Sequence, residues 1–322
     1  MKLKYYVSAV PNFGDDLNAA LWPHFVPEIF DDSTTEAFIG IGTIIGFPCT
    51  PQTRLNVFST GAGNDPLSRW ADLDVTYWCV RGPLSARLLG LSPDHAISDG
   101  AVLTPLAKGF PHARAGTSGV LVIPHWQSLN DPGWDEVARL TGFELLDPRG
   151  SPETVIARIA NAQCVLTESL HGAILADTYG IEWAPFATTG NFQISKWLDW
   201  ALSCGRDLTI NFVPPPSADG IMRHGRPPAP FGHSVVITDG MAMQEMQTRT
   251  AEKRTPSLRD QAKGWIKRTG LINRLLDMSP DRTAQSMVAL ASRVEAASPE
   301  STIVRLQERM LARLEQLRRH AH

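Results

Sequence analysis

The segment CVLTESLHGAI, residues 164–174, joins a short apolar run directly to a helix start. Residues 164–167 predict a buried strand, since a short apolar run beside a turn suits a strand enclosed on both faces. A helix is expected over 172–179, and Gly180 follows it, as glycine often follows a helix C-terminus. A strand that leads straight into a helix is typical of an α/β protein.

The turn inside this segment carries the strongest candidates for a functional site. Ser169 can cap the helix with its side-chain oxygen. The first helical turn holds His171 and Gly172, and Glu168 stands just before it. Free backbone amides at a helix N-terminus attract anions, so this turn predicts an anion site. The alternative is a capped helix with a packed histidine.

Strands and helices alternate on both sides of this segment, which predicts parallel sheets built from strand–helix units. The expected strands are 3–9, 37–41, 55–59, 75–80, 95–98, 119–123, 143–146 and 183–186, and the expected helices are 14–21, 84–89, 134–141 and 152–160.

Residues 108–118 are rich in Gly, Pro and Ser and have no periodicity, so a domain boundary is expected there. The chain is accordingly divided into α/β domains at 1–110 and 111–215. Residues 216–322 are expected to form a proline-rich loop, which includes 212–231, followed by helices that break near Ser298-Pro299. Two open α/β domains that face each other place a ligand cleft between the carboxyl ends of their strands.

The composition excludes several classes of protein. The chain has 322 residues, 43% of them hydrophobic, so it can bury a core and global disorder is excluded. Its formal charge of −3 excludes a nucleic-acid binder held by overall charge. Residues 251–322 nevertheless carry 14 Lys and Arg against 8 Asp and Glu.

The four cysteines form no CxxC pair and have no histidine at zinc-finger spacing, so neither a disulfide scaffold nor a structural zinc site is expected. The thiols are interpreted as reduced core residues of a cytoplasmic protein. We find no secretory signal, and the longest apolar stretch, 37–47, is shorter than the ~20 residues that a membrane span needs.

A second candidate turn is NFGDDLN, residues 12–18, between a strand and a helix. Gly14 allows backbone to approach a ligand, and Asn12, Asp15 and Asp16 surround it. Helix capping by Asp15 and Asp16 is the alternative.

Further candidates end other strands or follow them along the expected cleft. Arg81 suits a carboxylate or phosphate, or forms a salt bridge at a helix N-terminus. Asp99 and His125 end two more strands, and Lys196 is either a ligand contact or a solvated lysine. The glycines at 61 and 63 lack the third glycine of a dinucleotide motif, which excludes a nicotinamide site there.

Several motifs, in order and spacing, resemble the polysaccharide pyruvyl transferases. They are N-F-G-D-D-L-N (12–18), V-R-G-P-L-S-A (80–86), I-S-D-G-A (97–101) and E-S-L-H-G-A-I-L-A-D (168–177). F-I-G-I-G-T (38–43), P-H-W (124–126) and K-W-L-D-W (196–200) are similar to the branch that makes ketal pyruvates on bacterial exopolysaccharides such as succinoglycan. The resemblance covers about residues 1–205.

This resemblance implies a glycosyltransferase-B-like pair of Rossmann-like domains with phosphoenolpyruvate in the cleft. It implies transfer of the pyruvyl group to two hydroxyls of a sugar as a cyclic ketal, with release of phosphate. The family histidine falls on His171, and the family's acidic turn falls on Asp15 and Asp16. Ser169 replaces a common family arginine, so Arg81 or Lys196 would supply more of the positive charge.

The residue types suit this chemistry. The enol methylene takes a proton, a sugar hydroxyl loses one, and cations hold the carboxylate and the phosphate. His171 is expected as acid or phosphate clamp, Glu168 or Asp15 as base, and Arg81 as carboxylate clamp. No metal and no cofactor besides the co-substrate are expected.

Two other functions stay open at this stage. One is a nucleotide-sugar-dependent glycosyltransferase of the same architecture, and the other is a non-catalytic scaffold in polysaccharide assembly. The expected acceptor is a lipid-linked oligosaccharide. The basic C-terminal helices either pack on the domains or touch the anionic cytoplasmic face of the inner membrane.

Overall fold

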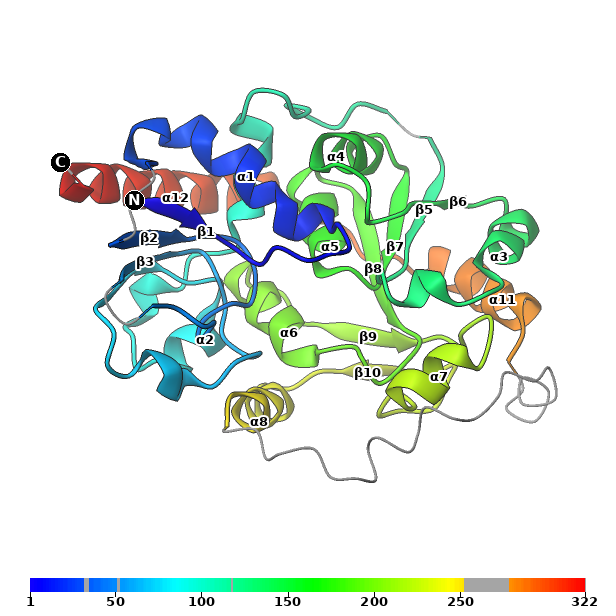
Figure 1. Cartoon of the computed structure of the whole chain (residues 1–322). Helices are drawn as coiled ribbons and strands as arrows, with labels where there is room; N and C mark the ends of the chain where they lie inside the picture. The colour runs from blue at the N-terminus through cyan, green and yellow to red at the C-terminus, as the bar shows by residue number, and fades with distance from the viewer. Residues whose placement is uncertain (32–34, 51–52, 117, 252–277, 322) are drawn as a thin grey trace.

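The computed structural model describes residues 1–31, 35–50, 53–116, 118–251 and 278–321. Within these residues the protein is an α/β structure with two sheets, which lie on the left and on the right of Figure 1. All strand pairs are parallel except one at the edge of the second sheet. The expected α/β class with parallel, Rossmann-like sheets is therefore confirmed.

The first sheet has the order β1-β2-β3-β4. Its strands are β1 (Lys2–Lys4), β2 (Glu36–Ile39), β3 (Arg54–Phe58) and β4 (Val75–Cys79), and the nearby helices are α1 (Phe13–Phe25), α2 (Pro83–Leu88) and α12 (Glu300–Ala321). Phe38 of β2 and Phe58 of β3 stack on each other and meet Trp22 of α1 edge-on, so aromatic packing joins α1 to this sheet.

The second sheet has the order β10-β9-β8-β7-β5-β6. Its strands are β5 (Val120–Ile123), β6 (Glu144–Leu145), β7 (Cys164–Thr167), β8 (Glu182–Ala187), β9 (Thr209–Phe212) and β10 (Ser234–Val236). Its helices are α3 (Trp134–Thr141), α4 (Pro152–Ala160), α5 (Leu170–Thr178), α6 (Ile194–Ser203), α7 (Asp219–His224), α8 (Asp239–Thr250) and α11 (Pro280–Ala291).

Helices cross between the two sheets. α1, beside the first sheet, contacts α4 of the second, and α6 of the second sheet contacts α2 of the first. The two halves of the molecule therefore pack against each other through helices. The largest cluster of buried apolar side chains accordingly includes Leu17 and Trp22 of α1 together with Ile174 of α5 and Trp197 of α6. One continuous core therefore supports the loops at the carboxyl ends of both sheets.

Three sequence predictions of local structure are wrong. Residues 95–98 form no strand, because Pro93 begins a 3-10 turn and only Ala96 bridges to Val80. The first strand stops at Lys4, after which the chain turns outward and leaves Tyr6 46% exposed. The expected loop at 212–231 contains α7, whose first residue, Asp219, carries a charge that suits a helix N-terminus.

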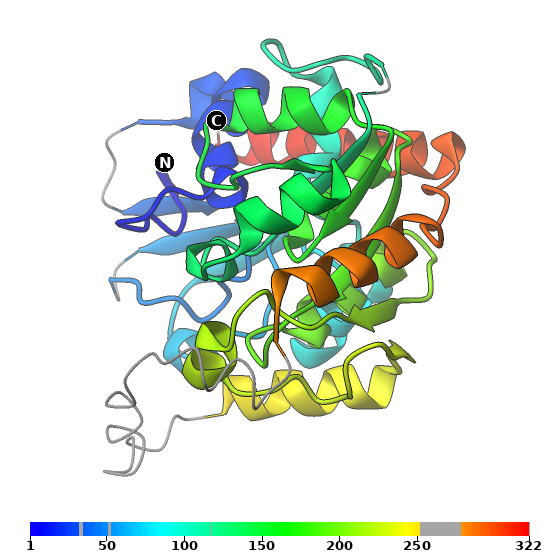
Figure 2. The same cartoon turned by 90° about the vertical axis from the view of Figure 1, so that its right-hand side faces the viewer.

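The two C-terminal helices pack on the core. Figure 2 shows α11 beside α3, and the break before Glu300 lies where it was predicted. α12 contacts β4 and buries Leu306, Met310, Leu314 and Leu317. The packing interpretation of the basic C-terminal helices is thus confirmed for α11 and α12, whereas residues 252–277 of this basic segment lie outside the described residues.

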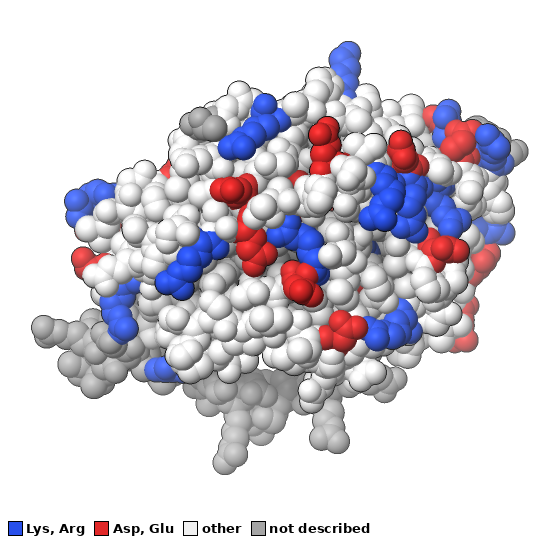
Figure 3. All heavy atoms as spheres, turned by 180° about the vertical axis from the view of Figure 1, so that it is seen from behind, with Lys and Arg blue, Asp and Glu red and all other residues white. Residues whose placement is uncertain are grey.

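The face of the protein in Figure 3 carries charges of both signs. From behind, Lys and Arg side chains are interspersed with Asp and Glu (Figure 3), and on α12 Arg318 and Arg319 pair with Glu315. No helix in the described ranges is long and apolar enough to cross a membrane.

All four cysteines are described and free, and three of them are buried.

Candidate active site

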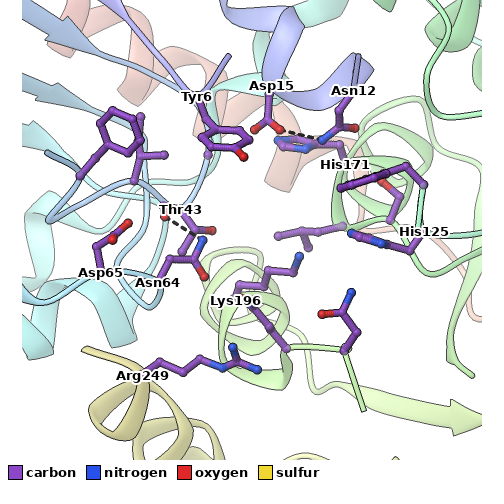
Figure 4. A pocket seen from close by; sticks show the side chains of 18 of the residues that line it. Tyr6, Asn12, Asp15, Thr43, Asn64, Asp65, His125, His171, Lys196 and Arg249 are labelled. Atoms are coloured by element: carbon purple, nitrogen blue, oxygen red, sulfur yellow. Dashed lines mark hydrogen bonds between the residues drawn. The ribbon is translucent and has the colours of Figure 1, made fainter. Parts of the chain in front are cut away.

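A cavity of about 800 Å³ opens where the carboxyl ends of the strands of both sheets meet. Both halves of the chain line it, and Figure 4 shows side chains that point into it from each. The first half contributes Tyr6, Asn12, Asp15, Thr43, Asn64, Asp65 and Arg81, and the second contributes His125, Trp126, Ser169, His171, Lys196 and Arg249. Seven of the twelve candidate residues thus line this one cavity: Asn12, Asp15, Arg81, His125, Ser169, His171 and Lys196.

The turn from β7 to α5 has the predicted cap. The Oγ atom of Ser169 accepts a hydrogen bond from the Gly172 amide at 3.4 Å. A side chain on Gly172 would strike the Thr167 hydroxyl, since an added Cβ would lie 2.6 Å from its oxygen. Gly172 therefore packs the helix against its strand and does not line the cavity.

His171 lies against the first turn of α1. A Cβ added to Gly14 would lie 2.0 Å from Nδ1 of His171, so only glycine leaves room for the imidazole. The functional interpretation of Gly14 was a close approach of backbone to a ligand, but the group that approaches it here is His171. The side chain of His171 is 12% exposed, and burial lowers its pKa to about 4 although Asp15 opposes this shift. The ring is therefore neutral at pH 7.

Asp15 is the carboxylate in the cavity wall beside His171. Its Oδ2 atom accepts a hydrogen bond from Nδ2 of Asn12 at 2.7 Å (Figure 4). Burial raises the pKa of Asp15, and the neighbouring His171 and the Asn12 hydrogen bond reduce that rise. Asp16 instead accepts from the Asn12 amide at 3.1 Å, so the capping alternative is confirmed for Asp16, which does not line the cavity.

Glu168 lies behind the cavity wall. Its Oε2 atom accepts from the His125 amide at 3.1 Å, and its Oε1 atom accepts from the amide and the hydroxyl of Thr188 at 2.7 and 2.6 Å. Burial raises its pKa, and these hydrogen bonds oppose that rise. Glu168 therefore joins the ends of β5 and β8, and both its oxygens are already occupied.

His125 is held in place by this carboxylate and is neutral. Burial lowers the pKa of His125 to about 3, and the nearby Lys196 adds to the effect. Its Nδ1 atom accepts a hydrogen bond from the Gln127 amide at 3.3 Å. The ring thus faces the cavity as a neutral polar group.

Arg81 forms the salt bridge at a helix N-terminus that was one of its two interpretations. Its Nε atom lies 3.2 Å from Oδ2 of Asp199, and its Nη1 atom donates to the Thr43 hydroxyl at 2.7 Å. Asp199 in turn accepts from the amide of Ser85, in the first turn of α2, at 2.9 Å. Arg81 and Asp199 are 1% and 0% exposed, so the pair lies at the floor of the cavity.

Lys196 extends from α6 into the middle of the cavity (Figure 4). It forms no ion pair with any residue that the structure describes. Burial lowers its pKa to about 8, and the positive charge of Arg81 adds to this shift. The cavity therefore holds one unpaired ammonium beside two neutral histidines.

Asp99 does not line the cavity. It is buried beneath His171, and its Oδ1 atom accepts a hydrogen bond from the Ala101 amide at 3.0 Å. The same oxygen lies 3.8 Å from Nε2 of His171. Burial raises the pKa of Asp99 to about 6.

Several lining residues were not predicted from the sequence. Tyr6, Asn64 and Asp65 lie on the opposite wall from His125, and Arg249 comes from α8. Asn64 directly follows Gly63, so the glycine pair at 61 and 63 could have pointed to this part of the wall. No group of three or more metal-binding side chains occurs in the described ranges.

Comparisons with known proteins agree on one family. The family model described as polysaccharide pyruvyl transferase matches residues 28–190. Succinoglycan biosynthesis protein ExoV of Rhizobium meliloti (strain 1021) is 33% identical over 216 residues, which are 66% of this chain and 68% of that protein. No solved structure gives a significant match. The chain therefore belongs to the polysaccharide pyruvyl transferase family and is a transferase enzyme.

Proposed function

We propose that the protein transfers the pyruvyl group of phosphoenolpyruvate to two hydroxyls of one sugar in an exopolysaccharide or its lipid-linked precursor. Carbon 3 of the enol takes a proton, and the two sugar oxygens form bonds to carbon 2. The bond from carbon 2 to the phosphate oxygen breaks. Two hydroxyl protons are released, one balancing the proton on carbon 3 and one leaving with phosphate, and the product is a cyclic ketal.

The unpaired Lys196 is the observation that supports an anionic donor most directly. It stands in a cavity beside the capped N-terminus of α5, whose free amides add positive potential. Arg81 contributes further charge from the cavity floor. A small trianion with a carboxylate and a phosphate would offset the cost of keeping these groups desolvated.

The geometry supports different roles for the two candidate bases, Asp15 and Glu168. Asp15 lines the cavity next to His171 and Lys196, and burial raises its pKa, which makes it a better proton acceptor than an exposed carboxylate. Glu168 uses both oxygens to hold His125 and Thr188. We therefore assign Asp15 as the base, His171 as the acid, and Glu168 as a positioning residue.

The function is tested by incubating the full chain with phosphoenolpyruvate and a panel of lipid-linked oligosaccharides. The expected product is heavier than the acceptor by one pyruvic acid less one water, with one phosphate released per product. A sugar transferred from a nucleotide sugar, with no use of phosphoenolpyruvate, would establish the glycosyltransferase alternative instead. Phosphoenolpyruvate should also raise the melting temperature, because it binds only the folded protein.

Donor affinity should depend on pH through Lys196. Its pKa of about 8 means that the free enzyme loses this charge as the pH rises through 8. Affinity for phosphoenolpyruvate should then fall by up to about tenfold per pH unit above pH 8, since Lys196 must take up one proton for the donor to bind. The dissociation constant is measured by calorimetry from pH 6.5 to 9.5.

The matched control for this pH dependence is Lys196→Arg, because a guanidinium stays charged over the whole range. This variant should bind the donor with no loss of affinity from pH 7 to 9.5. An unchanged slope in Lys196→Arg would assign the titration to another group and remove Lys196 from the donor site.

The other end of the cavity suits the sugar acceptor. Tyr6 and Phe47 meet edge to face with their ring centres 6.3 Å apart, and Asn64 and Asp65 stand near them. Aromatic rings offer apolar faces to the C–H surfaces of sugars, and amide and carboxylate groups bind hydroxyls. We therefore place the acceptor at this wall and the donor between Lys196 and His171.

Tyr6→Ala should raise the KM for the acceptor by about tenfold, the equivalent of ~1.4 kcal/mol, and leave the KM for phosphoenolpyruvate unchanged. Tyr6→Phe keeps the ring and should stay within about twofold of the wild type for both substrates. Both constants come from steady-state kinetics. A higher donor KM in Tyr6→Ala would place this wall in the donor site instead.

The finer architecture and location follow as parts of the same proposal. Donor and acceptor would meet in the cleft of a glycosyltransferase-B-like pair of domains, at 1–110 and 111–215, with 216–322 as the extension. A lipid-linked acceptor would hold the enzyme near the cytoplasmic face of the inner membrane. Sedimentation of the full chain with anionic vesicles at low salt tests that contact.

A further inference from the structure

A cluster of buried polar groups lies directly beneath His171. Among the described residues, nine buried side-chain polar atoms have no hydrogen-bond partner, and four of them belong to Ser59, Arg81, Asp99 and His171. Native proteins leave few such atoms unpaired, so a group of four in one place calls for an explanation. We call these four residues the buried polar cluster.

The topology of the first sheet brings the cluster together. Ser59 follows β3, Arg81 follows β4, and Asp99 follows the position of Ala96, which bridges in parallel to Val80. An added Cβ on Gly100 would lie 2.8 Å from the Ser59 hydroxyl, so Ser59 and the turn at Asp99 are in close contact. Ser59 also has a φ of +67°, the only positive value at a non-glycine residue in the described ranges. Such strain is typical of functional sites.

The two nitrogens of His171 face different surroundings. Nδ1 lies at the first turn of α1, beside the cavity, where Gly14 leaves room for it. Nε2 is buried and lies 3.8 Å from Oδ1 of Asp99, which is just beyond a direct hydrogen bond. Asp99 also has a free oxygen, Oδ2, with no partner among the described residues.

We propose that Asp99 is a positioning residue that keeps the proton of the neutral His171 ring on Nε2 and stabilises the imidazolium when Nδ1 takes up a second proton. With its proton on Nε2, on the side of the Asp99 carboxylate, the ring leaves the Nδ1 lone pair on the side of the cavity. Nδ1 is then the atom that takes up a proton and delivers it to carbon 3 of the donor. This inference rests on the proposed role of His171 as the acid.

Charged groups from four elements face His171. Asp15 on α1 favours the imidazolium, whereas Lys196 on α6 and Arg81 after β4 oppose it. Asp99, 3.8 Å from Nε2, also favours the imidazolium when it is ionised. Burial outweighs the acids in the free protein and holds the pKa of His171 at about 4. Binding of a trianionic donor adds negative charge, which raises this pKa toward the working pH. Removing Asp99 should lower this raised pKa in the donor complex, because His171 then titrates at a pH at which Asp99, with its pKa of about 6, is ionised.

The test is Asp99→Asn, compared with the wild type in kcat at a series of pH values. The kcat should fall by about 10- to 100-fold, part of what a general acid contributes, while the KM for phosphoenolpyruvate stays within about twofold. The limb on which activity is lost with rising pH should move about one to three units lower, because an opposite charge at this distance shifts a pKa by that amount. A variant with unchanged kcat and an unmoved limb overturns the proposal.

Asp177→Asn is the matched control, because Asp177 is also fully buried and also has one oxygen without a partner among the described residues. Its other oxygen accepts from Trp183, Arg206 and Ser298, away from the cavity. This control should lower the melting temperature and leave the pH limb in place. An equal shift of the limb in Asp177→Asn would show that loss of a buried carboxylate acts generally, and would overturn the specific role of Asp99.

A measurement on the wild type covers the case in which Asp99→Asn fails to fold. Nitrogen-15 NMR of histidine-labelled protein, with the His171 signals assigned by their absence in His171→Gln, reports which ring nitrogen carries the proton. Protonated Nε2 at pH 7 is expected, and protonated Nδ1 overturns the proposal. This readout needs no turnover, so it separates a failure of the Asp99 inference from a failure of the proposed reaction.

Discussion

His171→Ala should abolish pyruvyl transfer while the protein stays folded. The imidazole stands between the cavity and the buried Asp99, and among the described residues it is the side chain that lies nearest to a Cβ added at Gly14. Removing a general acid typically lowers the rate by ~10²–10⁴-fold. Ketal formation is measured by mass, and the fold is checked by circular dichroism and thermal unfolding.

The control for His171→Ala is His112→Ala. His112 belongs to the same residue type but lies outside the cavity, where its Nδ1 contacts the backbone oxygen of Pro105. This variant should keep full turnover. Turnover near the wild-type value in His171→Ala would remove His171 from the chemistry and leave it a packed histidine, the alternative interpretation of its motif.

The parts of the fold that were predicted correctly have local causes. The strand at 164–167 and the helix at 152–160 have the expected bounds, because apolar runs, Pro152 at a helix start and the Ser169 cap act within a few residues. The helix α6 was not predicted. Its buried face includes Trp197 and Trp200, but the charged Asp199 is also buried. A charged residue on the buried face interrupts the helical spacing of apolar residues by which a helix is predicted.

The site was predicted less evenly than the fold. Asp15, His125 and His171 meet in the cavity because strand ends of parallel sheets meet at one edge, which is visible in a sequence. Glu168 and Asp99 lie one layer deeper, and a sequence does not distinguish a lining carboxylate from one that supports it. The pairing of Arg81 with Asp199 joins residues 118 positions apart, so no local pattern indicates it.

That ion pair predicts a large effect on stability. Arg81→Ala should lower the free energy of unfolding by about 3–5 kcal/mol, because Asp199 stays buried without its counter-charge. Domains are stable by about 5–15 kcal/mol, so the loss is a large share and should be plain in urea unfolding at pH 7. The comparison is the double variant Arg81→Leu with Asp199→Leu, which removes both charges. Its loss of unfolding free energy should be clearly smaller than the sum of the losses in Arg81→Leu and Asp199→Leu alone.

Stability and donor binding separate the two roles of Arg81. Asp199→Asn weakens the same pair but leaves the guanidinium in the cavity wall, so it should lower stability with little change in affinity for phosphoenolpyruvate. If Arg81 also binds the donor carboxylate, Arg81→Ala should bind phosphoenolpyruvate about ten- to hundredfold more weakly, since a charge-assisted hydrogen bond contributes roughly 1.5–3 kcal/mol. Equal donor affinity in the two variants would make Arg81 purely structural.

A wild-type unfolding midpoint in Arg81→Ala would contradict the buried ion pair itself, because an uncompensated Asp199 at 0% exposure cannot stay buried without lowering the free energy of unfolding.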